Sequence, residues 1–597
     1  MSQASLPALR QSLAEHGLDA YLLPHSDPHQ SEYLPEHWRL MPWLTGFTGS
    51  AGTVVVTQDF AGVWTDSRYF IQAAEQLAGS GFELMKLKVP HTPEYIEWLT
   101  QNLGAGQKVG VDPRLLSLSQ AERLQKAFAP QQIELQAAPD LATQPWQDRP
   151  ALPNLPIVDH PVDFAGKSRV EKLKQLRDRM AERQIDWHLF SALDDLAWLF
   201  NLRGSDVAYN PVFLGFALVG QQEAHLFLHA SKLPPTLAET LLAEGITLHD
   251  YADIDRYLAQ LDPQQKLYFP SIATSWHLAQ QWPQQQATQR GNSLVAEFKA
   301  VKNHAEIQAL RQVMIRDGVA MVRFLHWLTQ AVHRGEPVTE VSAAERLEHL
   351  RAQQPNFVGP SFGTIAGYGP NGAIVHYSAQ PESCATLRPE GIFLLDSGGQ
   401  YLDGTTDITR TIALGPPTEQ QRADYTRVLQ GHVELAMAVF PEGTGGHQLD
   451  ILARLPLWQQ QQNFGHGTGH GVGAYLNVHE GPQRISPSAS AAYPFAPGMI
   501  TSNEPGLYHE GQYGIRIENL ILCVEADEDE AFGRFFRFQT LSLCPLDRSL
   551  IDPTLLTPVQ IAWINQYHQQ VYEALSPHLD AEELAWLKEH TGGMGSW

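Results

Sequence analysis

The sequence contains few cysteines and no long apolar run. Its three cysteines, Cys384, Cys523 and Cys544, are too few for a disulfide framework in a chain of 597 residues, and we expect them to be reduced and buried. No run of about 18 apolar residues occurs, which predicts no transmembrane helix. The N-terminal sequence also lacks the apolar centre of a secretory signal. These absences favour a soluble, cytoplasmic protein.

Basic residues are also scarce relative to acidic ones. Lys and Arg number 41 and Asp and Glu 65, so the formal net charge is 41 − 65 = −24. This balance argues against nucleic acid as a partner, because phosphates require a basic surface, and against anionic membranes. Apolar residues make up 43% and charged residues 18% of the chain, which is ordinary for a globular protein.

Two boundaries divide the chain into three segments. Six prolines fall within residues 136–165, and because proline disfavours helix and removes a hydrogen-bond donor, we place a boundary near residue 155. A second boundary lies near residue 300, where Asn303 and Glu306 form a helix-capping pair before an apolar stripe. The predicted domains are residues 1–155, 156–300 and 301–597.

The first two segments contain a weak internal repeat. Each reads as a helix and a short strand, followed by W-L-x-x-x-x-G-S, which begins at Trp43 and at Trp198, and a second apolar strand. Alternating helices and strands predict α/β layers, so we expect two related α/β domains.

The C-terminal tail, about 540–597, reads as a helical extension. Trp563, Tyr567, Tyr572 and Leu575 share one helical face. An aromatic stripe of this kind is more often core than an oligomer contact, and we favour the core.

Three carboxylates lie in GIFLLDSGGQYLDGTTDITRTIAL, residues 391–414. We interpret the segment as a hairpin that turns at 397–399 and carries Asp396, Asp403 and Asp407. Asp396 and Asp407 could point at one spot. A hairpin with solvated aspartates is the alternative that this segment alone leaves open.

Histidines and glycines alternate in NFGHGTGHGVGAYLNVHEGP, residues 463–482. The segment lacks the strand, helix and distant acidic residue of a nucleotide-binding loop. His466, His470 and His479 instead fit metal or proton-transfer chemistry.

Further charged residues occur in SNEPGLYHEGQYGIRIENLILCV, residues 502–524. Glu504 precedes a Pro-Gly turn, while Arg516 and Glu518 share one face of a strand-like run. If Asp396, Asp407, His470, Glu504 and Glu518 converge, their charge of −4 would be cancelled by two divalent cations. Hard oxygen ligands without cysteine favour Mn²⁺, and Co²⁺, Fe²⁺ and Zn²⁺ are compatible. Two such ions suit metal-assisted hydrolysis.

These segments resemble the pita-bread metallopeptidases, whose ligand order is Asp, Asp, His, Glu, Glu. The words DGTTDITRT, GHGTGHGVG, NVHEGP, SNEPG and GIRIEN resemble the long, three-domain cytosolic type of the aminopeptidase P family in particular, and AIVHYS supplies a further histidine, His376. The resemblance implies two creatinase-like α/β domains followed by a pita-bread catalytic domain of α+β type.

The resemblance also implies roles. Asp396 would bind one metal ion, Asp407 and Glu518 would bridge two, and His470 and Glu504 would bind the other. Glu504 would also shuttle a proton while a bridging hydroxide attacks the carbonyl before proline. His376 and His479 would contact the substrate and stabilise the oxyanion. His466 would shape the proline side of the site, and Arg516 would orient the carboxylate ligands.

The implied activity is release of the N-terminal residue from peptides with proline at the second position, by a homodimer. A prolidase that cleaves only Xaa-Pro dipeptides uses the same ligands, although the two preceding domains argue against it. A non-catalytic pita-bread peptide-binding module is the alternative of a different class, and the complete ligand set disfavours it.

Overall fold

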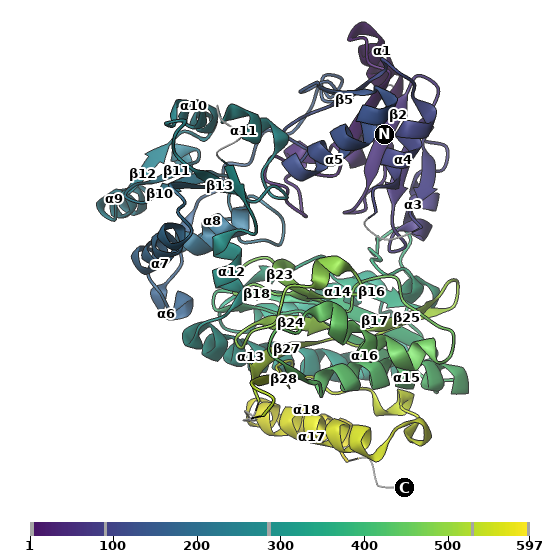
Figure 1. Ribbon diagram of the computed structural model, residues 1–597. Coiled ribbons are helices and arrows are strands. Elements are labelled where there is room, and N and C mark those ends of the chain that lie inside the picture. The colour runs from purple at the N-terminus through teal and green to yellow at the C-terminus, as the bar shows by residue number, and fades with distance from the viewer. Residues whose placement is uncertain (1–4, 89–91, 283–287, 527–530, 594–597) are drawn as a thin grey trace. The chain divides into compact units, whose positions relative to one another are not determined.

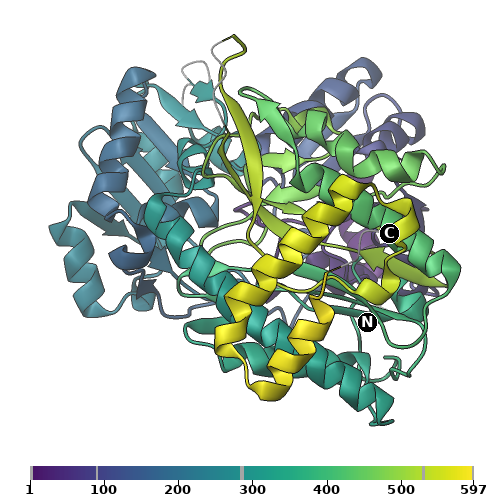
Figure 2. The same cartoon turned by 90° about the horizontal axis from the view of Figure 1, so that it is seen from below.

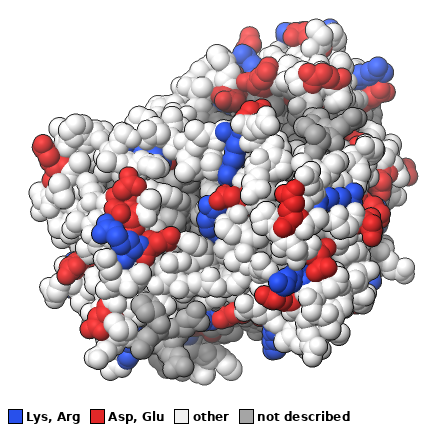
Figure 3. Space-filling view, turned by 90° about the horizontal axis from the view of Figure 1, so that it is seen from above, with Lys and Arg blue, Asp and Glu red and all other residues white. Residues whose placement is uncertain are grey.

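The structure, a computed structural model, describes residues 5–88, 92–282, 288–526 and 531–593 (Figure 1). It divides into two compact units, Met1–Val162 with Lys167–Ala296, and Asp163–Gly166 with Glu297–Trp597. In the described part of the chain, no helix is both long and apolar enough to span a membrane. On the face shown in Figure 3, acidic and basic side chains lie interspersed among uncharged ones.

The first α/β domain is built on a mixed six-stranded sheet. Its strands run in the order β4 (Glu83–Lys86), β3 (Ala61–Thr65), β2 (Thr53–Thr57), β1 (Ala20–Pro24), β5 (Lys108–Val111) and β6 (Glu134–Ala137). Strand β2 is antiparallel to both β1 and β3, and the remaining pairs are parallel. The helices of this domain are α1 (Ser5–Glu15), α2 (Leu40–Thr45), α3 (Phe70–Gln76), α4 (Glu94–Asn102) and α5 (Leu118–Phe128).

The second α/β domain repeats this sheet. Its strands are ordered β12 (Ile246–His249), β11 (Ala224–Phe227), β10 (Phe216–Gly220), β8 (Trp187–Phe190), β13 (Leu267–Phe269) and β14 (Thr288–Arg290). The pairing directions are those of the first domain, pair by pair. Both repeat tryptophans lie on the short helix between the first two strands, Trp43 on α2 and Trp198 on α8 (Leu193–Leu199). The predicted internal repeat is therefore confirmed as a repeated topology.

The other helices of the first unit lie in or beside the second domain. They are α7 (Arg169–Glu182), α9 (Pro235–Ala243), α10 (Ile254–Gln260) and α11 (Trp276–Gln281). Helix α12 (Leu294–Ala300) leads into the second unit.

The predicted helix cap lies within the second unit, a few residues after Glu297. Asn303 Oδ1 accepts from the amide of Glu306 at 3.0 Å, and the Glu306 carboxylate accepts from the amide of Asn303 at 2.9 Å. Helix α13 (His304–His333) follows, then α14 (Glu340–Ala352), α15 (Glu419–Ala436) and α16 (Gly446–Trp458). The cap satisfies backbone donors that the first turn of a helix leaves unpaired, so the helix begins where the sequence indicates.

These helices accompany four sheets of the second unit. A three-stranded sheet has the order β16 (Ile365–Tyr368), β17 (Ile392–Ser397) and β20 (Ile408–Ala413). A six-stranded sheet has the order β21 (Val439–Pro441), β28 (Phe535–Thr540), β27 (Asn519–Glu525), β24 (Ile500–Asn503), β22 (Gly469–Gly471) and β23 (Glu480–Ile485). Smaller sheets join β15 (Phe357–Pro360), β18 (Gly399–Tyr401) and β19 (Gly404–Thr405), and β25 (Gly506–His509) with β26 (Tyr513–Arg516).

The C-terminal extension packs onto this unit. Helices α17 (Pro558–Leu575) and α18 (Ala581–His590) contact α13, and Figure 2 shows them lying across it. Tyr567 and Leu575 are buried in the core that α13 and α15 share, while Trp563 and Tyr572 pack against that core and are partly buried. The prediction that the aromatic stripe is core is confirmed.

Arg410 connects the extension with the centre of the unit. Its guanidinium, almost fully buried, donates to the carbonyl oxygens of Cys544 and Pro545 and to the Tyr567 hydroxyl. It also donates to the Glu518 carbonyl oxygen at 2.8 Å. One side chain thus joins strand β20, the start of β27 and the extension.

The turn predicted at 397–399 is wrong. Strands β17 and β20 pair antiparallel, but the chain continues through β18 and reverses at residues 402–403, before β19. Gly398 serves another purpose: a Cβ atom there would lie 2.0 Å from Thr406 O and 2.2 Å from Ser361 Oγ. The glycine provides room for close strand packing.

The cysteines follow the prediction in part. All three are free; Cys523 and Cys544 are buried as expected, whereas Cys384 is half-buried.

Candidate metal centre

Two aspartates meet on the three-stranded sheet. Asp396 on β17 lies opposite Thr409 of β20, and Asp407 directly precedes β20. Because side chains two residues apart on a strand share a face, Asp407 and Thr409 project to the same side. Both aspartates are buried, with 7% and 4% of their surface exposed.

The remaining predicted ligands come from the six-stranded sheet and its connections. His470 is on β22, beside β24, and Asn503 of β24 pairs with Asn519 of β27. Glu504 and Glu518 flank that last pair and therefore lie at one end of the two strands. The predicted continuous strand is interrupted, because β26 ends at Arg516 and β27 begins at Asn519.

The structure brings these side chains together. Three overlapping groups have ligand atoms within 4.8 Å of one another: Asp396, Asp407 and Glu518; His470, Glu504 and Glu518; and Asp407, His470 and His479. His470 Nε2 lies 3.4 Å from Asp407 Oδ2 and 3.4 Å from Glu504 Oε1. All five side chains predicted as ligands lie in one cluster, together with His479.

The cluster carries more negative charge than its protein neighbours neutralise. Burial, and then the nearby carboxylates of Asp407 and Glu504, raise the pKa of Glu518 well above its usual range. Burial raises the pKa of Glu504 to about 7, against the opposing influence of His470. Burial lowers the pKa of His470, but its hydrogen bond with Asp407 and the charge of Glu504 outweigh this and raise it to about 9. Nearby cations would stabilise the ionised form of these buried, mutually repelling carboxylates.

The donor atoms fit divalent metal ions. Arg516 donates to Asp396 Oδ2 at 2.7 Å, and Thr409 donates to Glu518 Oε2 at 2.8 Å. Among the described residues, the other oxygens of these two carboxylates, Asp396 Oδ1 and Glu518 Oε1, are buried without a hydrogen-bond partner. His470 directs Nδ1 to the carbonyl oxygen of Gly471 at 3.0 Å, which leaves Nε2 available for a metal ion. Oxygen donors with one imidazole suit Mn²⁺, Fe²⁺, Co²⁺ or Zn²⁺.

Sequence reasoning missed several residues that orient the cluster. Tyr508 on β25 accepts from Arg516 Nη1 at 2.7 Å, and its hydroxyl lies 2.7 Å from His466 Nε2. Ser502 contacts two of the predicted ligands: its hydroxyl donates to Glu504 Oε1 at 3.2 Å and accepts from the amide of His470 at 3.0 Å. Thr409 could have been predicted from the sequence, because it lies two residues after Asp407 and so on the same face of the strand. Tyr508 and Ser502 carried no comparable signal.

The three remaining predicted histidines are connected with the cluster in different ways. The ring of His479 packs edge-on against that of His470, with centroids 4.3 Å apart. His466 is connected with the cluster through the Tyr508 hydroxyl, which also contacts Arg516. His376 is half-buried on the turn after the 3₁₀ helix η6 (Gly369–Ala373), and the carbonyl oxygen of its neighbour Val375 lies 3.4 Å from Arg516 Nη2.

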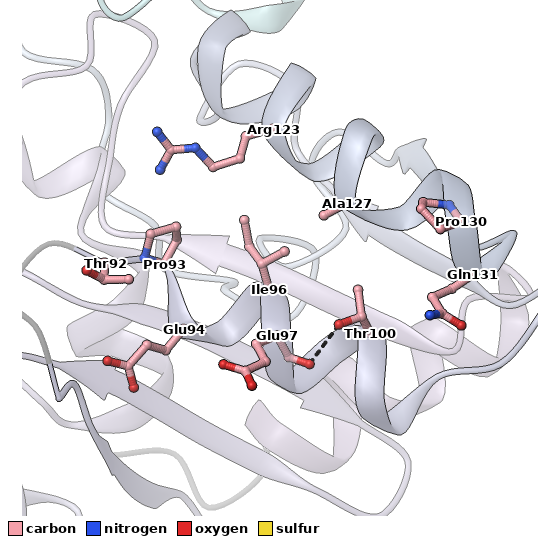
Figure 4. Close-up of a pocket in the computed structure, with 10 residues that line it drawn as sticks. All are labelled: Thr92, Pro93, Glu94, Ile96, Glu97, Thr100, Arg123, Ala127, Pro130 and Gln131. Atoms are coloured by element: carbon pink, nitrogen blue, oxygen red, sulfur yellow. Dashed lines mark hydrogen bonds between the residues drawn. The ribbon is translucent and has the colours of Figure 1, made fainter.

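The first domain also has a surface groove between α4 and α5 (Figure 4). Ile96, Thr100 and Ala127 line it, and the Thr100 hydroxyl donates to the carbonyl oxygen of Glu97. None of the predicted site residues lines this groove.

Comparisons with known proteins agree with this architecture. Family models match four successive segments: the creatinase/prolidase N-terminal domain at residues 6–142 and again at 148–306, metallopeptidase family M24 at 308–525, and the C-terminal region of peptidase M24 at 534–593. Aminopeptidase P1 of Lotus japonicus is 38% identical over 99% of both chains. A probable Xaa-Pro aminopeptidase P of Paracoccidioides lutzii is 39% identical over 98% of both.

A solved structure is similar over the whole chain. The X-prolyl aminopeptidase of Caenorhabditis elegans, described as a cytosolic enzyme with a di-nuclear active site, has a TM-score of 0.95 at 35% identity and covers 100% of both chains. The fold and the cluster thus define an M24 metallopeptidase that follows two creatinase-like domains. This chain belongs to the Xaa-Pro aminopeptidase P family.

Proposed function

We propose that this protein removes the N-terminal residue from peptides that have proline at the second position. The convergence of Asp396, Asp407, His470, Glu504 and Glu518 carries the proposal, and full-length similarity to Xaa-Pro aminopeptidases supports it. A prolyl bond is a tertiary amide without an N–H group, so general proteases lose a hydrogen-bond donor that they use to recognise the substrate. An enzyme for this bond needs a pocket that accepts the proline ring. The prolidase and binding-module alternatives are not favoured, since the relatives over the full length are aminopeptidases.

We assign two divalent ions, Mn²⁺ by preference, to the cluster. Asp396 would hold one, His470 and Glu504 the other, and Asp407 and Glu518 both. When bound, the ions supply Lewis-acid chemistry that activates water and polarises the carbonyl group to be attacked.

The chain's own groups manage protons and orientation. Glu504, with its pKa near 7 before metal binding, accepts a proton from the attacking water and delivers it to the departing proline nitrogen. His376 and His479 donate hydrogen bonds to the oxygen on which charge develops. Arg516 fixes Asp396, and Tyr508 joins Arg516 to His466, which we place beside the proline ring.

The wider organisation is part of the proposal. We place the domains at residues 1–155, 156–300 and 301–597, close to the segments that the family models match. We propose a cytoplasmic homodimer, by analogy with the relative described as cytosolic and with the long aminopeptidase P type.

Hydrolysis of Arg-Pro-Pro tests the function. The protein is stripped of metal, restored with Mn²⁺ and compared with the Glu504→Ala variant, with the dipeptide Arg-Pro as a second substrate. We expect Mn²⁺ to restore release of Arg from the tripeptide by the unaltered chain only. Cleavage of Arg-Pro alone would indicate a prolidase, and no cleavage with any divalent ion would contradict the enzyme function.

A further inference from the structure

Glu340 is a buried carboxylate outside the metal cluster. It is the first residue of α14 and has 0% of its surface exposed. Oε1 accepts from the amide of Tyr368 at 2.7 Å and from Asn371 Nδ2 at 2.9 Å. Oε2 accepts from the Tyr377 hydroxyl and from the amide of Ala385, each at 2.8 Å, and from Asn371 Nδ2 at 3.1 Å.

These partners enclose the segment that carries His376. Tyr368 and Asn371 lie immediately before it, Tyr377 follows His376 directly, and Ala385 lies where the chain returns. The return is also fixed by the backbone, because the amide of Glu340 donates to Ala385 O at 3.1 Å. One carboxylate therefore holds the chain on both sides of His376.

We propose that Glu340 is the positioning residue for His376 and thereby for the substrate carbonyl, an inference that rests on the proposed function. A carboxylate is required because both oxygens accept from a backbone amide. In Glu340→Gln, whichever way the amide group turns, its NH₂ faces the N–H of either Tyr368 or Ala385. A buried N–H then loses its acceptor, and the segment must shift.

Kinetics of a double-mutant cycle tests the proposal on the metal-loaded enzyme. Displacing a catalytic group by about an ångström lowers rates on the order of a hundredfold, so Glu340→Gln should lower kcat/KM by about tenfold to a hundredfold, mainly through kcat, with metal content unchanged. In the His376→Ala background the same substitution should change kcat/KM by less than about twofold, because coupled sites are not additive. Tyr377→Phe removes one of the hydrogen bonds and should have a smaller effect of the same kind.

Glu306→Gln is the matched control. Glu306 is also a buried glutamate in the first turn of a helix. Its carboxylate accepts from the amide of Asn303 in the cap of α13, and glutamine preserves such a cap. We expect no coupling to His376. Full additivity of Glu340→Gln with His376→Ala, or loss of metal from Glu340→Gln, would overturn the proposal and leave the proposed function intact.

Hydrogen exchange separates the two proposals. Glu340→Gln should accelerate amide exchange in residues 366–387 and leave β22 and β24 protected. Were the unaltered chain to cleave no peptide, the proposed function would fail, and the exchange result would still decide whether Glu340 holds this segment. Unchanged exchange there would contradict the positioning role.

Discussion

Glu480 lies between two lysines inside the second unit, and its replacement by glutamine should lower stability markedly. Lys299 Nζ lies 2.9 Å and Lys302 Nζ 2.5 Å from its carboxylate oxygens. The side chain of Glu480 is 0% exposed and those of the lysines 2%. Glu480→Gln removes the negative charge that faces both buried ammonium groups.

The magnitude follows from burial. Removing one partner of a buried ion pair costs about 3–5 kcal/mol. For a unit of this size, about 2 °C of melting temperature corresponds to 1 kcal/mol, so we expect Tm to fall by about 6–10 °C. Lys302→Met leaves one lysine against one carboxylate and fills similar volume, and should lower Tm by less than half as much.

Differential scanning calorimetry of both variants, at equal metal loading, measures the two shifts. The comparison is sharper than either value, since both substitutions break a contact at the same carboxylate. If Lys302→Met destabilised the protein as much as Glu480→Gln, the argument from an uncompensated charge would be refuted.

Two further predictions concern acid stability and close packing. His432 and His568 are buried, desolvation lowers the pKa of each to about 3, and Nε2 accepts a hydrogen bond in both. Between pH 6.5 and 3, therefore, only the unfolded chain binds protons at these sites. Each histidine should lower the free energy of unfolding by up to about 1.4 kcal/mol per pH unit as pH falls through this range. Urea unfolding midpoints between pH 7 and 5 test this, and His568→Gln should make stability depend less steeply on pH. Gly398→Ala should force the chain between Asp396 and Asp407 apart and lower bound metal and activity at least about tenfold. Gly359→Ala is the control, because an added Cβ there meets nothing within 4 Å, and it should change neither bound metal nor activity. Equal loss of metal from the two variants would contradict the steric argument.

Much of the fold and of the candidate site could be predicted from local sequence signals. The cap of α13 and the repeated α/β topology depend on residues three or four apart or on recurring strings, which a single sequence displays. The five clustered side chains each stand in a distinctive short segment, and the aspartates beside β17 and β20 follow the strand period.

The errors and omissions share a physical cause: the contacts arise from strand register and tertiary packing, which leave no periodic pattern in a single sequence. Glycines at 398 and 399 resemble a turn, yet Gly398 is required by the approach of Thr406 O, and sequence does not distinguish glycine needed for space from glycine needed for conformation. Tyr508 meets Arg516 only through the register of a hairpin. Glu340 finds its partners 28 to 45 residues away, a separation that leaves no periodic trace.

Arg410 has a consequence for how this protein can be divided. The M24 match ends at residue 525 and the C-terminal match begins at 534, which invites excision of the first as a minimal catalytic fragment. Such a fragment would strip a buried guanidinium of Cys544, Pro545 and Tyr567 as acceptors and uncover the apolar core beneath α17. The same guanidinium holds the backbone of Glu518. The smallest fragment able to keep its metal ligands in place therefore includes the extension through α17.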